Sequence, residues 1–111
     1  MIRRFKLCAG LDVSITLDID TSVMTEEMAA EVNAFWHGKE EVLRAAGGDV
    51  IQAVARRAAI PLLHTLLSGC NKRFVVVQTF ADREGWPQPT GISVVDYEIP
   101  ELDACSLELE A

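Results

Sequence analysis

Few residues in this sequence have types and spacings that could support catalysis. His37 and His64 are its only histidines, and each could act as a general base or as a metal ligand. Neither lies in an HxxxH or CxxC spacing, so a structural role is favoured for both. Cys70 has Lys72 and Arg73 beside it, and nearby cations favour the reactive thiolate form of a cysteine. A reactive thiol therefore competes with the simpler interpretation of a small apolar residue at a helix-to-strand junction.

A second candidate site is the loop string Glu84-Gly85-Trp86-Pro87, the most distinctive local pattern in the chain. A loop tryptophan next to a proline is a common anchor for a partner or ligand, which makes Trp86 a candidate binding residue. Arg83 and Glu84 could supply a charged rim around it. The same tryptophan could instead fold back and cap the core, with its indole NH bonded to a carbonyl. Both alternatives stay open.

Other motifs of catalysis or cofactor binding are missing from the sequence. There is no glycine-rich phosphate loop, no GxSxG nucleophile elbow and no pair of carboxylates at a catalytic spacing. Gly47-Gly48 precedes a helix, but Asp49 would repel a phosphate from its amides. The three cysteines lack metal-ligand spacing and are typical of free thiols in a reducing cytoplasm. We therefore predict no catalytic residue, cofactor or metal, and a cytoplasmic location.

Composition restricts the partners of this chain. Its 111 residues carry a formal net charge of −7, and every charged residue after Arg83 is acidic. This balance argues against nucleic acid, because phosphate contacts need lysine and arginine. No apolar run reaches the roughly 18 residues of a membrane-spanning helix, and the N-terminal segment lacks a signal-peptide pattern. We expect one domain over residues 1–111 that binds neither nucleic acid nor membrane.

The segment that must organise the fold is 49–68, where apolar residues recur at helical spacing. Asp49, with Gln52 three residues later, forms a capping-box pattern at its start, and Gly69 is a typical stop at its end. Pro61 interrupts this pattern because it has no amide for the helical hydrogen-bond ladder. A kink at Pro61 and a break into two helices are both open, and the continuous apolar stripe favours the kink.

Strands and shorter helices complete the predicted fold. Residues 2–8 and 13–19 alternate between apolar and polar, which predicts an antiparallel hairpin, and two short helices are expected before the organising helix. Residues 74–80 are β-branched and aromatic, which predicts a central strand, and 92–99 predicts another. Residues 106–110 alternate again and predict either a short edge strand or a frayed tail. The expected class is α+β, a mainly antiparallel sheet with helices on one face, in the order β-β-α-α-α-β-β(-β).

The organising helix is apolar on two sides near its C-terminal end. Leu63 and Leu67 lie off its main stripe. One side can face the sheet, and the other needs either the short helix at 39–46 or a second subunit. An isologous contact is the commonest closed solution, so we expect a homodimer.

Three segments resemble a known group of proteins. They are MTEEMAAEVNAFWHGKEEVLRAAGGDVIQAV at 24–54, EGWPQPTGISVVDYEIPEL at 84–102, and the acidic end of the chain. In this order they resemble a family of uncharacterised small bacterial domains found in phage and mobile-element contexts. The resemblance implies a shared α+β fold and that genomic setting, and it implies no activity.

The leading hypothesis for function is a non-enzymatic accessory or interaction protein that acts by binding another protein. It depends on the lack of catalytic constellations, the acidic C-terminal third and the Trp86 loop. One alternative is an acidic nucleic-acid mimic that inhibits a DNA-binding host protein. Another is a small enzyme with a site at Cys70 or His64.

Overall fold

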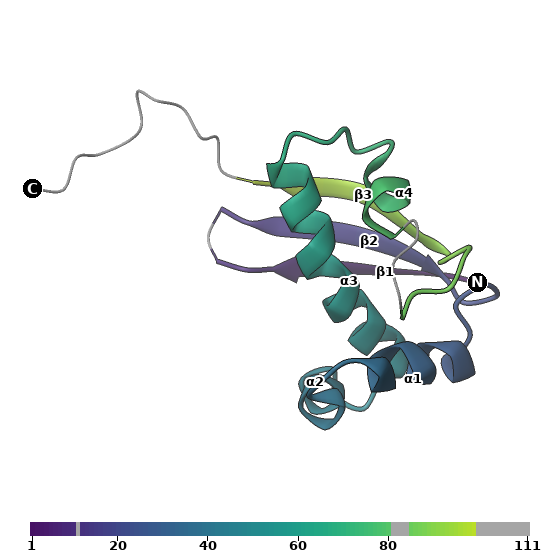
Figure 1. Ribbon diagram of the computed structural model, residues 1–111. Helices are drawn as coiled ribbons and strands as arrows, with labels where there is room; N and C mark the ends of the chain where they lie inside the picture. Colours follow the sequence, from purple (N-terminus) through teal and green to yellow (C-terminus); the bar gives the residue numbers. More distant parts are fainter. Residues whose placement is uncertain (11, 81–84, 100–111) are drawn as a thin grey trace, which may run out of the picture.

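The computed structural model describes residues 1–10, 12–80 and 85–99. Three strands and four helices follow one another in this part of the chain (Figure 1). In chain order they are β1 (Ile2–Cys8), β2 (Ser14–Asp20), α1 (Glu26–Phe35), α2 (Lys39–Ala45), α3 (Val50–Leu67), α4 (Val75–Phe80) and β3 (Ile92–Glu98).

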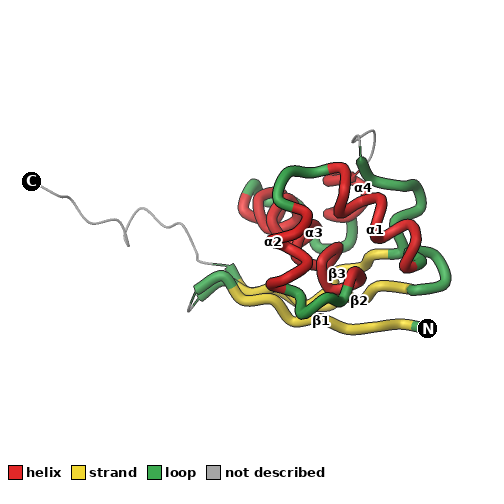
Figure 2. Tube along the Cα trace, turned by 90° about the horizontal axis from the view of Figure 1, so that it is seen from below, coloured by secondary structure: helices red, strands yellow, loops and turns green. Residues whose placement is uncertain are grey.

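The three strands form one antiparallel sheet in the order β1-β2-β3, and the helices cover one of its faces (Figure 2). Residues Ile15, Leu17 and Ile19 of the central strand β2 point into this covered side and are fully buried. They alternate with polar neighbours, which is the pattern of a strand that has one face in the core and the other face toward solvent. The predicted α+β class, with helices on one face of an antiparallel sheet, is confirmed.

The hairpin of β1 and β2 has the predicted alternation. Leu7 lies opposite Ile15 and Phe5 opposite Leu17 on the helix side, whereas Arg4 and Lys6 are exposed on the outer face. Phe5 and Leu7 are only half-buried, in contrast to their partners on β2. The edge strand β1 is therefore less covered by the helices than the central strand.

A bulge in β3 changes which of its residues face the core. Leu17 of β2 lies opposite Val94 and Thr16 opposite Asp96, so Val95 is an extra residue on β3. Ile92 and Val94 before the bulge, and Tyr97 after it, pack on the core, while Asp96 is exposed. Simple alternation along 92–99 would have put Asp96 on the same side as Ile92, and the bulge removes that conflict.

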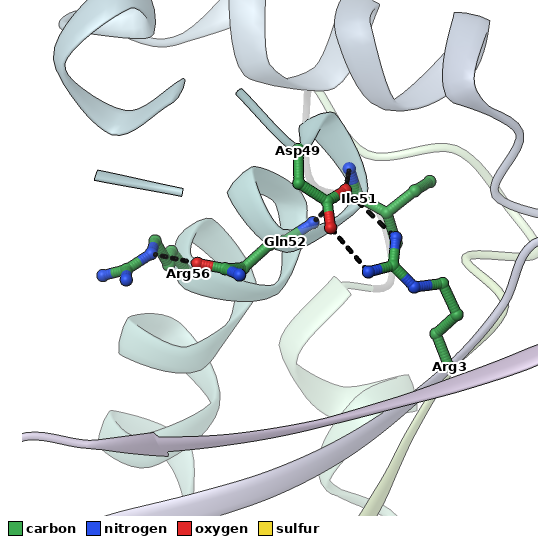
Figure 3. A network of polar contacts seen from close by, with 5 residues as sticks. All are labelled: Arg3, Asp49, Ile51, Gln52 and Arg56. Carbon is green, nitrogen blue, oxygen red and sulfur yellow. Dashed lines mark hydrogen bonds and ion pairs between the residues drawn. The ribbon is translucent and has the colours of Figure 1, made fainter. Parts of the chain in front are cut away.

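The organising helix α3 begins as predicted and runs without a break. The Asp49 carboxylate accepts hydrogen bonds from the amides of Ile51 and Gln52 at 3.1 and 3.3 Å. The Gln52 side chain accepts a bond from Arg56 instead of reaching back to Asp49, so the capping box is only half formed (Figure 3). Pro61 lies inside the continuous helix, so the predicted alternative of a break there is wrong.

The prediction of a central strand at 74–80 is wrong, because these residues form the short helix α4. Val75, Thr79 and Phe80 are buried at helical spacing, and Phe74 and Val77 are exposed. The Thr79 hydroxyl lies 2.8 Å from the Thr65 hydroxyl of α3. Packing of this one face against α3 and β3 outweighs the β propensity of the valines. The observed order is therefore β-β-α-α-α-α-β, and the further strand predicted at 106–110 lies outside the described residues.

By length and composition α3 could cross a membrane, with a mean hydropathy of 1.2 over 18 residues. Half of this stretch is buried inside the fold, against the sheet and the other helices. Arg56 and Arg57 also lie near its middle. These features are those of the core helix of a globular domain.

Candidate functional site

A broad groove of about 1110 Å³ follows α3. The end of β1, from Lys6 to Cys8, lines it together with Ala9, α2 and the two tryptophans Trp36 and Trp86. Arg56, Ile60 and His64 recur four residues apart in its lining and so lie along one row of α3, with Arg57 beside them.

The charge of this groove is opposite to that of the chain. Its lining contains three permanent cations, Lys6, Arg56 and Arg57, against one carboxylate, Glu41. The whole sequence has a formal net charge of −7. A local reversal of this kind favours anionic groups at the groove over the rest of the surface.

Arg57 is a half-buried cation that has only neutral partners among the described residues. Its Nε donates to the Asn33 side-chain oxygen at 3.0 Å, and its NH2 group donates to the Asn33 carbonyl at 3.3 Å. Burial lowers the pKa of the Arg57 guanidinium below its ordinary value. A carboxylate placed in the groove would offset this desolvation, because bidentate arginine–carboxylate bonds are among the strongest in proteins.

Asn33 is what holds Arg57 in place. It is a buried polar residue of α1, and its amide nitrogen also donates to the Lys39 carbonyl at 3.0 Å. The same side chain thus connects α1 to the start of α2 and to α3. The position of Arg57 is therefore set by the packing of three helices.

Arg56 precedes Arg57 on α3 and is exposed. Its Nε donates to the Gln52 side chain at 3.2 Å (Figure 3). In the same view the Asp49 carboxylate faces Arg3 of β1, with bonds of 3.0 and 2.5 Å. The Asp49 carboxylate at the start of α3 is thus bonded to Arg3 and not to Arg56.

Apolar side chains lie beside these cations. Ile60 is 55% exposed on α3, and Trp36 is 37% exposed after the end of α1. The Trp36 ring meets Phe35 edge-on with centroids 4.9 Å apart. Tryptophan and arginine are enriched among the central residues of protein–protein interfaces.

Trp86, the binding residue predicted from the sequence, is 7% exposed and packs on Phe80 with ring centroids 4.5 Å apart. It contributes to the core cluster and reaches the groove only at its margin. This packing is that of the core-capping alternative, and a binding role for Trp86 stays a prediction. Arg83 and Glu84, predicted to form a rim around it, lie outside the described residues.

The histidines and cysteines are divided between the groove and other parts of the described chain. His64 and Cys8 both line the groove, whereas His37 is exposed beyond the end of α1. The Cys70 thiol donates to the side chain of Gln78 at 3.2 Å, next to α4. Among the described residues, no group of three His, Cys, Asp or Glu is placed to hold a metal ion.

Leu63, which was predicted to face either the short helix at 39–46 or a second subunit, is 5% exposed and belongs to the core. Leu67 is 41% exposed, so it remains available for such a contact. The groove was not predicted from the sequence, although Arg56, Arg57 and His64 lie on the polar side of the helical pattern. These polar positions indicated an exposed face of α3. The groove itself could not be predicted from them, because its other walls come from β1 and α2, which are distant from α3 in sequence.

No curated protein and no solved structure matches this chain. The sequence model of one family matches residues 14–109, a range that includes β2, the four helices and β3. This confirms an uncharacterised domain family. The chain belongs to a family of proteins of unknown function (DUF2528).

Proposed function

We propose that this protein acts by binding another protein, and that the α3 groove holds an extended segment of the partner. The segment would alternate between carboxylate and apolar side chains. The observation that carries this proposal is the cationic lining of the groove in a chain of net charge −7. Carboxylates would meet Arg56 and Arg57, and apolar side chains would meet Ile60 and Trp36.

The proposal also includes the setting of the protein. We place it in the cytoplasm as a non-enzymatic accessory protein of a phage or mobile element. The resemblance of 24–54 and 84–102 to domains from such elements supports this setting. The genes that neighbour its own would test it, because an accessory protein of a mobile element is encoded beside other genes of that element.

The binding proposal can be tested with a defined probe. We would measure fluorescence anisotropy of a labelled peptide of alternating leucine and glutamate, and of a second peptide of alternating leucine and lysine. Only the glutamate peptide should bind. Arg56→Glu should weaken its binding about tenfold or more, because a charged hydrogen bond is replaced by repulsion.

The matched control is Arg44→Glu, which makes the same charge change on an exposed residue of α2 outside the groove lining. It should leave the affinity within about twofold of the parent, since long-range charge is largely screened at physiological salt. Equal affinity for the two peptides, or equal losses in the two variants, would contradict a specific acidic-segment site.

A further inference from the structure

The helical layer of this protein extends past its sheet on the side of β1. In Figure 1 the helices α1 and α2 lie beyond β1, on the side away from β2 and β3. Among the described residues they contact α3 and each other, and neither lies beside a strand. α2 has no buried residue, although it contains Val42 and Leu43. The described sheet is therefore narrower than the layer of helices above it.

Backbone groups of β1 point toward this space. The Ala9 amide donates to the Val13 carbonyl and the Thr21 amide to the Met1 carbonyl, both at 2.8 Å and both in the register of the β1–β2 pairing. Because alternate residues of a strand direct their backbone groups to opposite edges, the odd-numbered residues of β1 bond to β2. The even-numbered residues direct their amides and carbonyls to the outer edge, where no described strand pairs with them.

The side chains of this edge differ between its two faces. Phe5 and Leu7 lie on the helix side and are only half-buried, whereas their partners on β2 are fully buried. Lys6 is exposed on the outer face and makes no ion pair among the described residues. β1 contains three cations and no carboxylate, so pairing with the β1 of a second copy would bring like charges together. A segment with apolar side chains on one face and carboxylates on the other complements both faces.

We propose that the acidic segment of the partner binds as a fourth strand, added to the outer edge of β1. In this mode of recognition main-chain hydrogen bonds, here to Arg4, Lys6 and Cys8, supply affinity, and alternate side chains supply specificity. The apolar side chains of the segment pack against Leu7 and Val42, which line the same groove. Its carboxylates lie beside Lys6, and the chain that continues past Cys8 brings a further carboxylate to the α3 arginines.

This inference rests on the proposed function and specifies how the partner is held. An added strand satisfies the outward amides and carbonyls of β1, which a bound helix cannot do. The partner must therefore supply a segment that is extended when it binds. A strand added here also gives α1 and α2 a part of the sheet to cover.

The backbone of the probe peptide provides the test. The leucine–glutamate peptide is made in two N-methylated forms, one methylated at the leucine amides and the other at the glutamate amides. Each form loses the donors along one edge of the extended peptide only, and an added strand pairs with β1 through one edge. We expect one form to bind about tenfold or more weakly than the other in fluorescence anisotropy, because several hydrogen bonds are lost together.

The form that loses affinity also gives the direction of the added strand. In antiparallel pairing with leucines toward the helices, the glutamate amides point to β1, and in parallel pairing the leucine amides do. A loss confined to either form supports the added strand. The two forms have the same composition and the same number of methyl groups, so each is the control for the other.

The outcomes separate this inference from the proposed function. Equal affinities of the two methylated forms, or loss of both, overturn the added strand. The groove function then stands if the unmethylated peptide binds and Arg56→Glu weakens that binding. An unmethylated peptide that does not bind overturns the proposed function, and the added strand with it.

A charge change on β1 tests the outer face of the added strand. Lys6→Glu should weaken binding of the unmethylated peptide about fivefold, because a carboxylate is then placed beside carboxylates. Arg44→Glu is again the matched control, and equal affinities of these two variants would contradict the position of the segment at β1. A parent dimer that the peptide dissociates would overturn the choice of partner, because a second copy would then occupy the edge.

Discussion

Two pairs of neighbouring arginines in this protein have opposite surroundings. Arg3 and Arg4 of β1 each make two bonds to a carboxylate, Arg3 to Asp49 and Arg4 to Asp18. Arg56 and Arg57 of α3 bond only neutral oxygens among the described residues. The first pair is neutralised by carboxylates of the fold, whereas the second leaves its charge at the surface of a groove.

Under the proposed function, this difference separates a structural use of arginine from a binding use. The Arg3 guanidinium joins β1 to the first turn of α3, and its hydrogen bonds hold the pKa of Asp49 below the ordinary range. For Arg57 the situation is reversed. Burial lowers the pKa of its guanidinium, and no described carboxylate pairs with it to offset the loss of hydration. Stability should therefore depend on the β1 arginines, and ligand affinity on those of α3.

The largest expected effect concerns Trp86, which lines the groove but packs in the core. Trp86→Ala should lower the free energy of unfolding by about 3 kcal/mol, because a cavity forms beside Phe80. Trp36→Ala, at the exposed end of α1, should cost less than about 1 kcal/mol. Urea unfolding measures both. Equal losses would remove the distinction between residues that build the groove and residues that bind in it.

Asp49→Ala should have the next largest effect. It removes the cap of α3 and the partner of Arg3, and it should lower the free energy of unfolding by about 1.5 kcal/mol. Most of this comes from the cap, because the ion pair is partly exposed and contributes about 0.5 kcal/mol or less. Asp12→Ala, at an exposed position before β2, is the control. A loss of the same size there would show that the effect is one of net charge.

A crossed pair of variants sharpens the comparison. Arg3→Gln should lower the free energy of unfolding by about 0.5 kcal/mol and leave the affinity for the leucine–glutamate peptide unchanged. Arg56→Gln should do the reverse, with about fivefold weaker binding and an unfolding free energy within about 0.5 kcal/mol of the parent. If both variants change the same property, the two arginine pairs do not have separate roles.

The Arg3–Asp49 bond also predicts a smaller effect of pH. Because the pKa of Asp49 is lowered in the folded protein, its contribution is present above the unfolded value of about 3.9 and is lost as pH falls through the lowered one. The stability difference between the parent and Arg3→Gln should be constant from about pH 8 to pH 5 and shrink below about pH 4. Urea titrations over this range would contradict the pairing if the difference grew in acid.

The homodimer expected from the sequence stays a prediction. The variant that tests it should have the smallest effect on the stability of the monomer. Leu67→Glu should shift the mass seen by sedimentation at micromolar concentration from dimer to monomer. It should change the monomer's unfolding free energy by less than about 0.5 kcal/mol, because Leu67 is 41% exposed. A parent protein that sediments as a monomer would remove the dimer and leave the groove to other partners.

Several elements could be read directly from local patterns. The alternation of 13–19 predicted a strand with one wet face, and Ile15, Leu17 and Ile19 are fully buried. Asp49 was recognisable as a cap because its carboxylate precedes an apolar period. These predictions succeeded because the cause of each structure lies within a few residues of sequence.

The candidate site was less predictable. Trp86 and its charged neighbours attracted attention as an unusual string, but the tryptophan packs on Phe80. Arg56 and Arg57 occupy polar positions of the helical pattern, which are usually solvent-exposed without a special role. What distinguishes them is that no described carboxylate forms an ion pair with them, and neighbours in space are not visible in a single sequence.

By itself the sequence determined the class of the fold, the long central helix and the acidic balance of the chain, because these follow from local periodicity and composition. Tertiary structure decided the rest. Residues 74–80 are helical because one face of them packs on α3 and β3, against the preference of their valines. Val95 forms a bulge because Tyr97 is needed in the core. The groove exists because β1 and α2 stand beside α3, and long-range packing of this kind overrides local propensity.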